Sequence, residues 1–171
     1  PGSGISATKP IKYTLTVKNI AALSSNGSGS ITASDLTGDS NFQIGLSGSG
    51  SINLSSLKSD QVSININGSG SAAIPTINSQ SLNADLSGNG TLEVGGQTSD
   101  QKINLSGSGS FNGENLVSKT AVANTNGSGD ILVKVSDTLV ATSNGSGDIT
   151  YIGSPTVTQR RNGSGTITQK S

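Results

Sequence analysis

The sequence predicts an all-β protein that folds as a single-domain parallel β-helix, a solenoid of about eight coils with roughly 20 residues per coil and no significant helix. A short motif, typified by Asn67-Gly68-Ser69-Gly70, recurs along the whole chain, and its first glycines stand 21, 20, 20, 19, 20, 18 and 18 residues apart. Apolar residues also recur at fixed offsets from each motif. A fixed period near 20 is typical of repeat architectures, in which each unit buries its apolar face against its neighbours.

Each motif is expected to form a corner of the coil. Asn or Ser before Gly tolerates left-handed backbone, and two glycines allow the chain to bend without a side-chain clash. The predicted structural glycines are Gly27, Gly29, Gly48, Gly50, Gly68, Gly70, Gly88, Gly90, Gly107, Gly109, Gly127, Gly129, Gly145, Gly147, Gly163 and Gly165.

The residues around each corner alternate between apolar and polar, which predicts two short strands per unit. Two architectures satisfy this pattern: an antiparallel meander with glycine hairpins, and a parallel β-helix with one coil per unit. The β-helix is favoured because it stacks equivalent residues, and the position four after the first glycine is almost always apolar. Its occupants are Ile31, Ile52, Ala72, Leu92, Phe111, Ile131, Ile149 and Ile167.

The two ends of the chain depart from the repeat. Residues 1–10 are expected to be a flexible lead-in and residues 11–171 the β-helix, with residues 11–17 alternating strictly enough to form an extra strand. Near the other end, Thr125, Ser143 and Arg161 replace the aliphatic residue found two before the first glycine in the central units. This indicates an end that is frayed, capped or docked on a partner.

Composition excludes several classes of function. Ten basic and ten acidic residues cancel, and the longest basic cluster is Arg160-Arg161, so neither nucleic acid nor an anionic membrane surface is an expected partner. No apolar run approaches the roughly 20 residues of a transmembrane segment. Cysteine and histidine are absent, which removes disulfides, thiolate metal sites and the commonest general base.

Two aspartates are the candidate metal ligands. Asp130 and Asp148 occupy the same position in adjacent units, where the other units carry Ser or Thr. Stacked carboxylates repel one another unless a cation or solvent intervenes, and calcium prefers clustered oxygen atoms. A calcium site is therefore one alternative and a solvated polar face is the other. A second set of aspartates marks the opposite corner at unequal offsets and is interpreted as polar turn residues: Asp39, Asp60, Asp100 and Asp137.

The repeated Gly-Ser-Gly-(Ser/Asp)-Ile motif resembles the bacterial GIN-type head domain family of auto-transporter adhesins. The most specific part of the resemblance is the ending, residues 147–155 (Gly-Asp-Ile-Thr-Tyr-Ile-Gly-Ser-Pro) followed by residues 162–167 (Asn-Gly-Ser-Gly-Thr-Ile). The resemblance covers residues 9–171 and implies a β-solenoid that lies in the periplasm or outside the cell, without assigned catalytic residues.

These observations favour a non-enzymatic, extracellular or cell-surface bacterial protein with a structural or adhesive role. End-to-end assembly into a filament through exposed end strands is a further expectation, because open strand edges must be capped or paired. The expected partner is accordingly a second copy of the chain or a cell-surface glycan. No cofactor is expected, apart from calcium in the metal-binding alternative. The alternatives are a glycan-binding or calcium-binding module and, less favoured, a polysaccharide-active enzyme, because no convergent acid and base residues are present.

Overall fold

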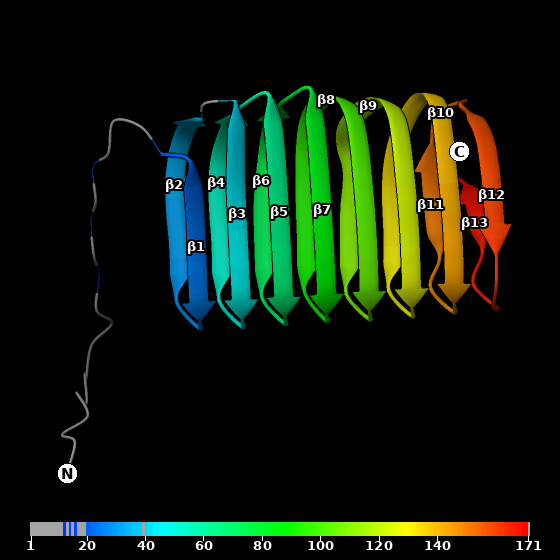
Figure 1. The fold of residues 1–171 in the computed structure, drawn as a ribbon, viewed down its shortest axis with the longest axis horizontal. Helices are drawn as coiled ribbons and strands as arrows, with labels where there is room; N and C mark the ends of the chain where they lie inside the picture. Colours follow the sequence, from blue (N-terminus) through cyan, green and yellow to red (C-terminus); the bar gives the residue numbers. More distant parts are fainter. Residues whose placement is uncertain (1–11, 13, 15, 17–19, 39, 171) are drawn as a thin grey trace, which may run out of the picture.

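The computed structural model describes residues 12, 14, 16, 20–38 and 40–170, and its strands wind into one elongated parallel β-solenoid (Figure 1). The strands are β1 (Ala22–Gly27), β2 (Ser30–Thr37), β3 (Asn41–Gly48), β4 (Ser51–Lys58), β5 (Gln61–Gly68), β6 (Ser71–Asn78), β7 (Ser81–Gly88), β8 (Thr91–Gly107), β9 (Ser110–Gly127), β10 (Asp130–Gly145), β11 (Ile149–Ile152), β12 (Thr156–Arg161) and β13 (Ile167–Gln169). None of the described residues lies in a helix, and accordingly none forms an apolar helix long enough to cross a membrane.

The strands form two faces, which meet at the glycine corners. The β1 face contains β1, β3, β5, β7, the second halves of β8, β9 and β10, and β12. The β2 face contains β2, β4, β6, the first halves of β8, β9 and β10, then β11 and β13. The glycine corners lie along one edge, at the bottom of Figure 1, and delimit about seven full turns.

All neighbouring strands are parallel and pair equivalent positions of successive repeats. Ile44 pairs with Ile64 and Ile64 with Ala84, while Gly48 pairs with Gly68 and Gly68 with Gly88. The predicted parallel β-helix is therefore confirmed, and the antiparallel meander is excluded. Repeating the same residue at the same position is what allows one side-chain type to pack on itself along the rod.

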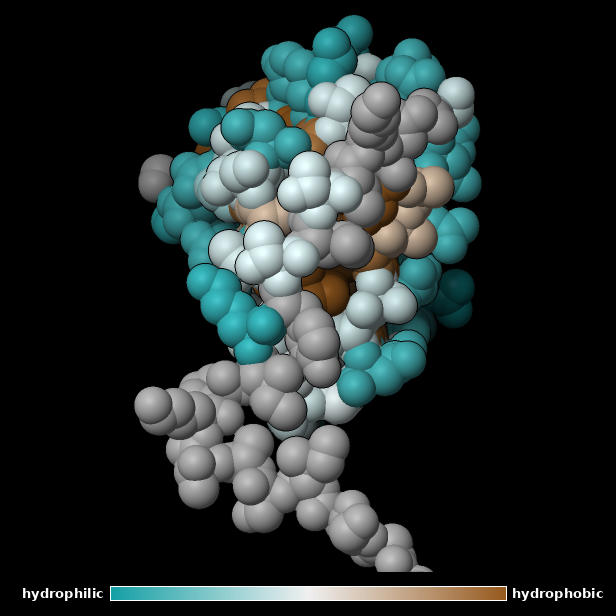
Figure 2. Space-filling model, turned by 90° about the vertical axis from the view of Figure 1, so that its left-hand side faces the viewer, coloured by the Kyte–Doolittle hydropathy of each residue, from teal (hydrophilic) through white to brown (hydrophobic). Residues whose placement is uncertain are grey.

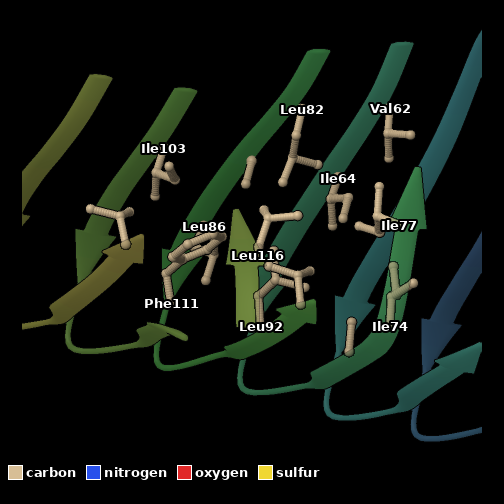
Figure 3. Close-up of a cluster of buried hydrophobic side chains, with 14 of the residues drawn as sticks. Val62, Ile64, Ile74, Ile77, Leu82, Leu86, Leu92, Ile103, Phe111 and Leu116 are labelled. Carbon is tan, nitrogen blue, oxygen red and sulfur yellow. The ribbon is translucent and has the colours of Figure 1, made fainter. Parts of the chain in front are cut away.

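The core is a narrow interior filled by the inward residues of both faces (Figure 3). Ile64, Ile74, Ile77, Ile103 and Leu116 are all fully buried there. These are aliphatic or β-branched residues at alternate strand positions, which pack well on a pleated surface. The low apolar content of the chain is therefore sufficient, because nearly every apolar residue of the central coils points inward.

Phe111 and Gly113 form a local exception in this core. The position six after the first glycine is aliphatic in neighbouring coils, as at Val94 and Val133, but is glycine at Gly113. Phe111 is 1% exposed, and a Cβ atom at Gly113 would lie 2.8 Å from its Cε1 atom. The phenylalanine ring thus takes the volume that an aliphatic side chain fills elsewhere.

The corner opposite the glycines changes character along the rod. Short loops follow β2, β4 and β6, whereas β8, β9 and β10 continue through this corner as single strands. Inside it, the amide nitrogen of Gln101 donates a 2.7 Å hydrogen bond to the Ser118 hydroxyl, and both side chains are buried. Register shifts next to Ile74, Glu93 and Val133 show that the β2 face is also bulged.

The two ends of the rod differ in polarity. At the β1/β2 end, the partly buried residues that contact the core are Ile20, Leu23, Ile31, Ala33 and Leu36, and Figure 2 shows apolar surface at this end within a hydrophilic rim. At the other end, the alternate positions that point inward in earlier coils hold three exposed polar residues: Gln159, Arg161 and Gln169. The last coil therefore places these three polar side chains over the interior, together with the partly buried Val157 and Ile167.

The predicted strand at 11–17 lies mostly outside the described residues. Only Lys12, Thr14 and Thr16 are described, and these three are exposed and not part of a strand. The predicted lead-in at 1–10 lies entirely outside the described residues.

Candidate functional surfaces

The glycine corners are built by backbone stacking. Gly68 has a φ of 119°, a region that residues with a Cβ atom rarely adopt, and a Cβ atom there would lie 2.6 Å from the Gly48 carbonyl oxygen. A Cβ atom at Gly70, the second glycine of that corner, would lie 2.7 Å from both the Gly50 oxygen and Leu46 Cδ2. The two glycines thus perform different tasks: the first supplies an unusual backbone angle, and both allow coils to approach closely.

Amide side chains form ladders beside these corners. The Asn144 amide donates a 2.8 Å hydrogen bond to the Asn126 side-chain oxygen, and the Asn162 amide donates a 2.7 Å bond to that of Asn144. A second ladder lies on the β1 face, where Asn124 donates to Asn104 and Asn104 donates to the Asp85 carboxylate. These hydrogen-bonded ladders fix the orientation of exposed polar side chains, which repeat at the distance between neighbouring coils.

Asp130 and Asp148 lie in adjacent coils, as predicted, but their carboxylates bind backbone amides. Oδ1 of Asp130 accepts a 2.9 Å hydrogen bond from the Asp148 N–H, and Oδ1 of Asp148 accepts a 2.7 Å bond from the Thr166 N–H. The Thr166 hydroxyl donates a further 2.9 Å bond to the same Asp148 atom. Each aspartate therefore connects its own coil to the next.

The aspartates replace a backbone acceptor that earlier coils use. The N–H of Thr91, at the equivalent position, donates to the carbonyl of Gly70 at 3.0 Å. In the later coils, the corresponding carbonyls of Gly129 and Gly147 instead accept hydrogen bonds from the hydroxyls of Thr125 and Ser143, at 2.9 and 2.8 Å. These hydroxyl groups are therefore needed because the aspartates have displaced the usual donor.

This exchange of hydrogen-bond partners explains why Thr125 and Ser143 replace the aliphatic residues of earlier coils. Thr125 is fully buried and Ser143 is 1% exposed, so neither position is frayed. Each lies five residues before the aspartate of its own coil, which is a signal that the sequence contained. Buried hydroxyls require hydrogen-bond partners, and here the glycine carbonyls supply them.

We predict that Asp148 makes stability depend on acidic pH. The Thr166 N–H and hydroxyl hold the pKa of this carboxyl below its ordinary value. Because the folded pKa is the lower one, the charged form stabilises the fold above the unfolded pKa, and the contribution is lost as pH falls through the folded pKa. Urea denaturation should show wild type more stable than Asp148→Asn at pH 7, with the difference shrinking as the pH falls below the ordinary aspartate pKa and through the lowered pKa of Asp148. A difference that does not change with pH would contradict this assignment.

The aspartates of the opposite corner do not converge on one site. Asp100 accepts a hydrogen bond from the Thr120 hydroxyl, and Asp137 accepts one from the neighbouring Ser136. Asp60 borders a shallow polar groove together with Lys58 and Gln80, while Asp39 lies outside the described residues. Among the residues that the structure describes, no three acidic side chains gather in a geometry that could hold a metal ion.

A cleft on the β2 face brings together residues that the sequence did not connect. It has a volume of about 350 Å³ and is lined by Ser110, Phe111, Asn112, Asp130, Ile131, Leu132, Thr150 and Lys170. Lys170 crosses from the last coil and forms a 2.7 Å ion pair with Glu114, 56 residues earlier in the chain. The repeat pattern gives no sign of this pair, because only the winding of the coils and the bulge in β9 bring Glu114 near the C-terminal segment.

The repeats match a known protein family. The sequence profile of the family described as "Putative auto-transporter adhesin, head GIN domain" matches residues 2–75 and 43–155. The chain belongs to this family. The family resemblance noted from the Gly-Ser-Gly motifs is thereby confirmed, and the match includes residues 147–155 of the ending but not residues 162–167. An adhesin family implies a location at the cell surface. A search of curated proteins found none that matches the chain.

Solved structures share the fold. A protein of Parabacteroides distasonis described as a "putative lipid binding protein" is 29% identical with a TM-score of 0.86, and the match covers 89% of this chain and 62% of that one. A "putative adhesin" of Bacteroides fragilis is 20% identical with a TM-score of 0.81, covering 90% of this chain and 94% of that one. Another from P. distasonis is 24% identical with a TM-score of 0.82, covering 88% and 64%. The chain thus spans less than two thirds of the length of two of these proteins.

Proposed function

We propose that this chain is a non-enzymatic adhesin-type module at the bacterial surface, extracellular or periplasmic, whose solenoid presents ordered polar groups to a partner. The observation that carries this proposal is the alignment of outward amide and hydroxyl groups into ladders held by hydrogen bonds between coils, as at Asn126, Asn144 and Asn162. Groups fixed before binding lose little conformational entropy when a partner binds, which favours recognition over an extended surface.

The membership of an adhesin family supports the same proposal. So does the placement of the carboxylates, because the described aspartates are spread over both faces and both edges, and several bind backbone or hydroxyl groups. A hydrolase would need an acid and a base held at a defined separation across one substrate bond.

Adhesion can be tested with beads that carry the purified chain, incubated on surfaces coated with mucin, extracellular matrix or bacterial cells. Retention on at least one surface, absent for beads carrying heat-unfolded chain, is the expected result. Equal retention of folded and unfolded chain would contradict an adhesive role for the ordered ladders. An assay with 5 mM calcium belongs in the same experiment, since a calcium-dependent gain would support the metal alternative at Asp130 and Asp148.

End-to-end filament assembly remains a second candidate, and the apolar β1/β2 end is the observation that favours it. The last coil weighs against a simple continuation, because Gln159, Arg161 and Gln169 would then be shielded from water against the apolar residues of the β1/β2 end, which costs free energy. Negative-stain electron microscopy over a concentration series tests this directly. Uniform long fibres would establish assembly, whereas dispersed short rods at every concentration would leave the single rod as the active form.

A further inference from the structure

The cleft on the β2 face contains a large apolar side chain at a position that is polar in most other coils. Leu132 pairs with Asn112 on one side and Thr150 on the other, so the three outward side chains form one row across β9, β10 and β11. The equivalent outward position holds Thr32, Asn53, Ala73, Glu93 and Thr168 in other coils, so Leu132 is the one large apolar residue there. Leu132 is half-buried in the cleft and supplies an apolar surface between hydrogen-bonding neighbours.

Polar groups surround this apolar surface on several sides. Asp130 lies next to it, and while its Oδ1 atom is bound by the Asp148 N–H, Oδ2 has no hydrogen bond among the described residues. The side chains of Asn112 and Thr150 line the same cleft, and so does the Lys170 chain. A cleft with an apolar surface and a few converging polar groups, at the lower end of the usual 300–1,000 Å³, is typical of small-molecule sites.

The charges in the cleft favour a neutral ligand. The Lys170 ammonium is already paired with Glu114 at 2.7 Å, and Asp130 is the carboxylate that remains available as an acceptor. An anionic ligand would be placed beside the Asp130 carboxylate, and a small ammonium ligand would pair with that carboxylate but leave the apolar surface of Leu132 without a partner. A ligand with several hydroxyl groups around an apolar C–H face matches both the acceptors and the leucine.

We propose that this cleft binds one neutral hexopyranose unit, as the terminal or internal sugar of a surface glycan. The C–H face of the ring packs on Leu132, and ring hydroxyls donate to Asp130 Oδ2 and exchange hydrogen bonds with Asn112 and Thr150. This inference rests on the proposed adhesin function and names the chemistry of its partner. It also gives a role to Asp130 that is separate from its bond to the next coil.

The test is titration of the isotope-labelled chain with a panel of neutral methyl hexopyranosides, followed by two-dimensional amide NMR. At least one sugar should bind with a Kd of ~1–10 mM, with shift changes confined to residues 110–112, 130–132, 150 and 170. Leu132→Thr should weaken binding by roughly fivefold or more, since it removes part of the apolar contact. Asp130→Asn keeps an oxygen for the Asp148 N–H but loses the charged acceptor, and it should also weaken binding.

The matched control is Val140→Thr, because Val140 is an outward aliphatic residue, 39% exposed, on the opposite β1 face. It should leave sugar affinity unchanged within twofold. Shift changes that map elsewhere, equal effects of Leu132→Thr and Val140→Thr, or no shift up to 50 mM of any sugar would each overturn the proposal. Binding of detergent or acyl-chain probes in the cleft, in place of sugars, would overturn it as well.

The bead assay separates this inference from the function on which it rests. If wild-type and Leu132→Thr beads adhere equally and no sugar binds the cleft, the adhesin function stands and the sugar site is refuted. If a sugar binds the cleft but wild-type beads adhere to no surface, the site stands and the adhesive role is refuted.

Discussion

Replacing Gly68 with alanine is expected to lower the free energy of unfolding by about 4 kcal/mol. Two costs add at this position. The φ of 119° strains any residue with a Cβ atom, at about 1–3 kcal/mol, and the added methyl would meet the Gly48 carbonyl oxygen at 2.6 Å, an overpacking cost of about 1–3 kcal/mol. Urea denaturation followed by circular dichroism, compared with wild type, measures the loss.

The first corner offers controls that separate these two costs. Gly27 has the same kind of backbone angle, with φ at 120°, but a Cβ atom there has no neighbour within 4 Å. Gly27→Ala should therefore cost only the backbone strain, about 1–3 kcal/mol. Gly29 has neither constraint, and Gly29→Ala should change stability by less than about 0.5 kcal/mol. Equal losses in all three variants would show that coil stacking does not set the requirement for glycine.

The difference between corners follows from their place in the rod. Gly27 belongs to the first described coil, and no described residue lies within 4 Å of a Cβ atom at this position, whereas Gly68 has the Gly48 backbone directly beside it. The same motif is therefore under different steric constraints in different coils. A repeat that reads uniformly in sequence can be tolerant of substitution at its end and intolerant in its middle.

The fold was predictable from the sequence because each coil repeats one local solution. The alternation around Gly48 and Gly68 gives the strands, and the recurrence of Ile44 and Ile64 at one position requires parallel stacking. In a repeat protein, each coil makes the same contacts with its neighbours, so the sequence of one repeat determines most of the fold. The burial of most apolar residues could be predicted for the same reason.

The cleft was not predictable, because its residues come from different coils and different repeat positions. Leu132 is the one large apolar residue at a mostly polar position, which is a signal visible in the sequence, but the presence of Lys170 beside it depends on the strand register. The Glu114–Lys170 ion pair depends on a register shift in β9 that no periodic pattern encodes. Local exceptions to a repeat can be found in sequence, but their spatial partners follow from bulges and from the path of the last coil.

Asp130 and Asp148 show a second limit of prediction from sequence. Sequence comparison of the coils identified the aspartates and, separately, the hydroxyl residues Thr125 and Ser143. Only hydrogen-bond geometry shows that they form one arrangement, in which a carboxylate takes the amide of the next coil and a hydroxyl satisfies the carbonyl left behind. Because each backbone N–H and C=O group at these corners needs a hydrogen-bond partner, the aspartates and the hydroxyl residues have a single explanation.

Phe111→Ala is expected to cost about 3–5 kcal/mol, because it removes a fully buried ring from the narrow core between the two faces. The cavity would lie beside Gly113, which has no side chain to fill it. Gly113→Val alone should also destabilise, by about 1–3 kcal/mol, since its Cβ atom would lie 2.8 Å from the ring. The two positions are therefore expected to depend on each other.

The double variant Phe111→Leu with Gly113→Val restores the Leu and Val pattern of the preceding coil, at Leu92 and Val94. Its destabilisation should be smaller than the sum of the Phe111→Leu and Gly113→Val effects by about 2 kcal/mol, a coupling typical of residues in contact. The rescue should be partial, because the new Cβ atom also approaches the Leu132 carbonyl oxygen at 3.1 Å. Gly113→Val combined with Phe42→Leu, in a distant coil, should be additive. If the effects of Phe111→Leu and Gly113→Val simply add, the large ring at position 111 does not compensate for the missing side chain at position 113. Glycine at 113 would then be required by the bulge in β9 instead.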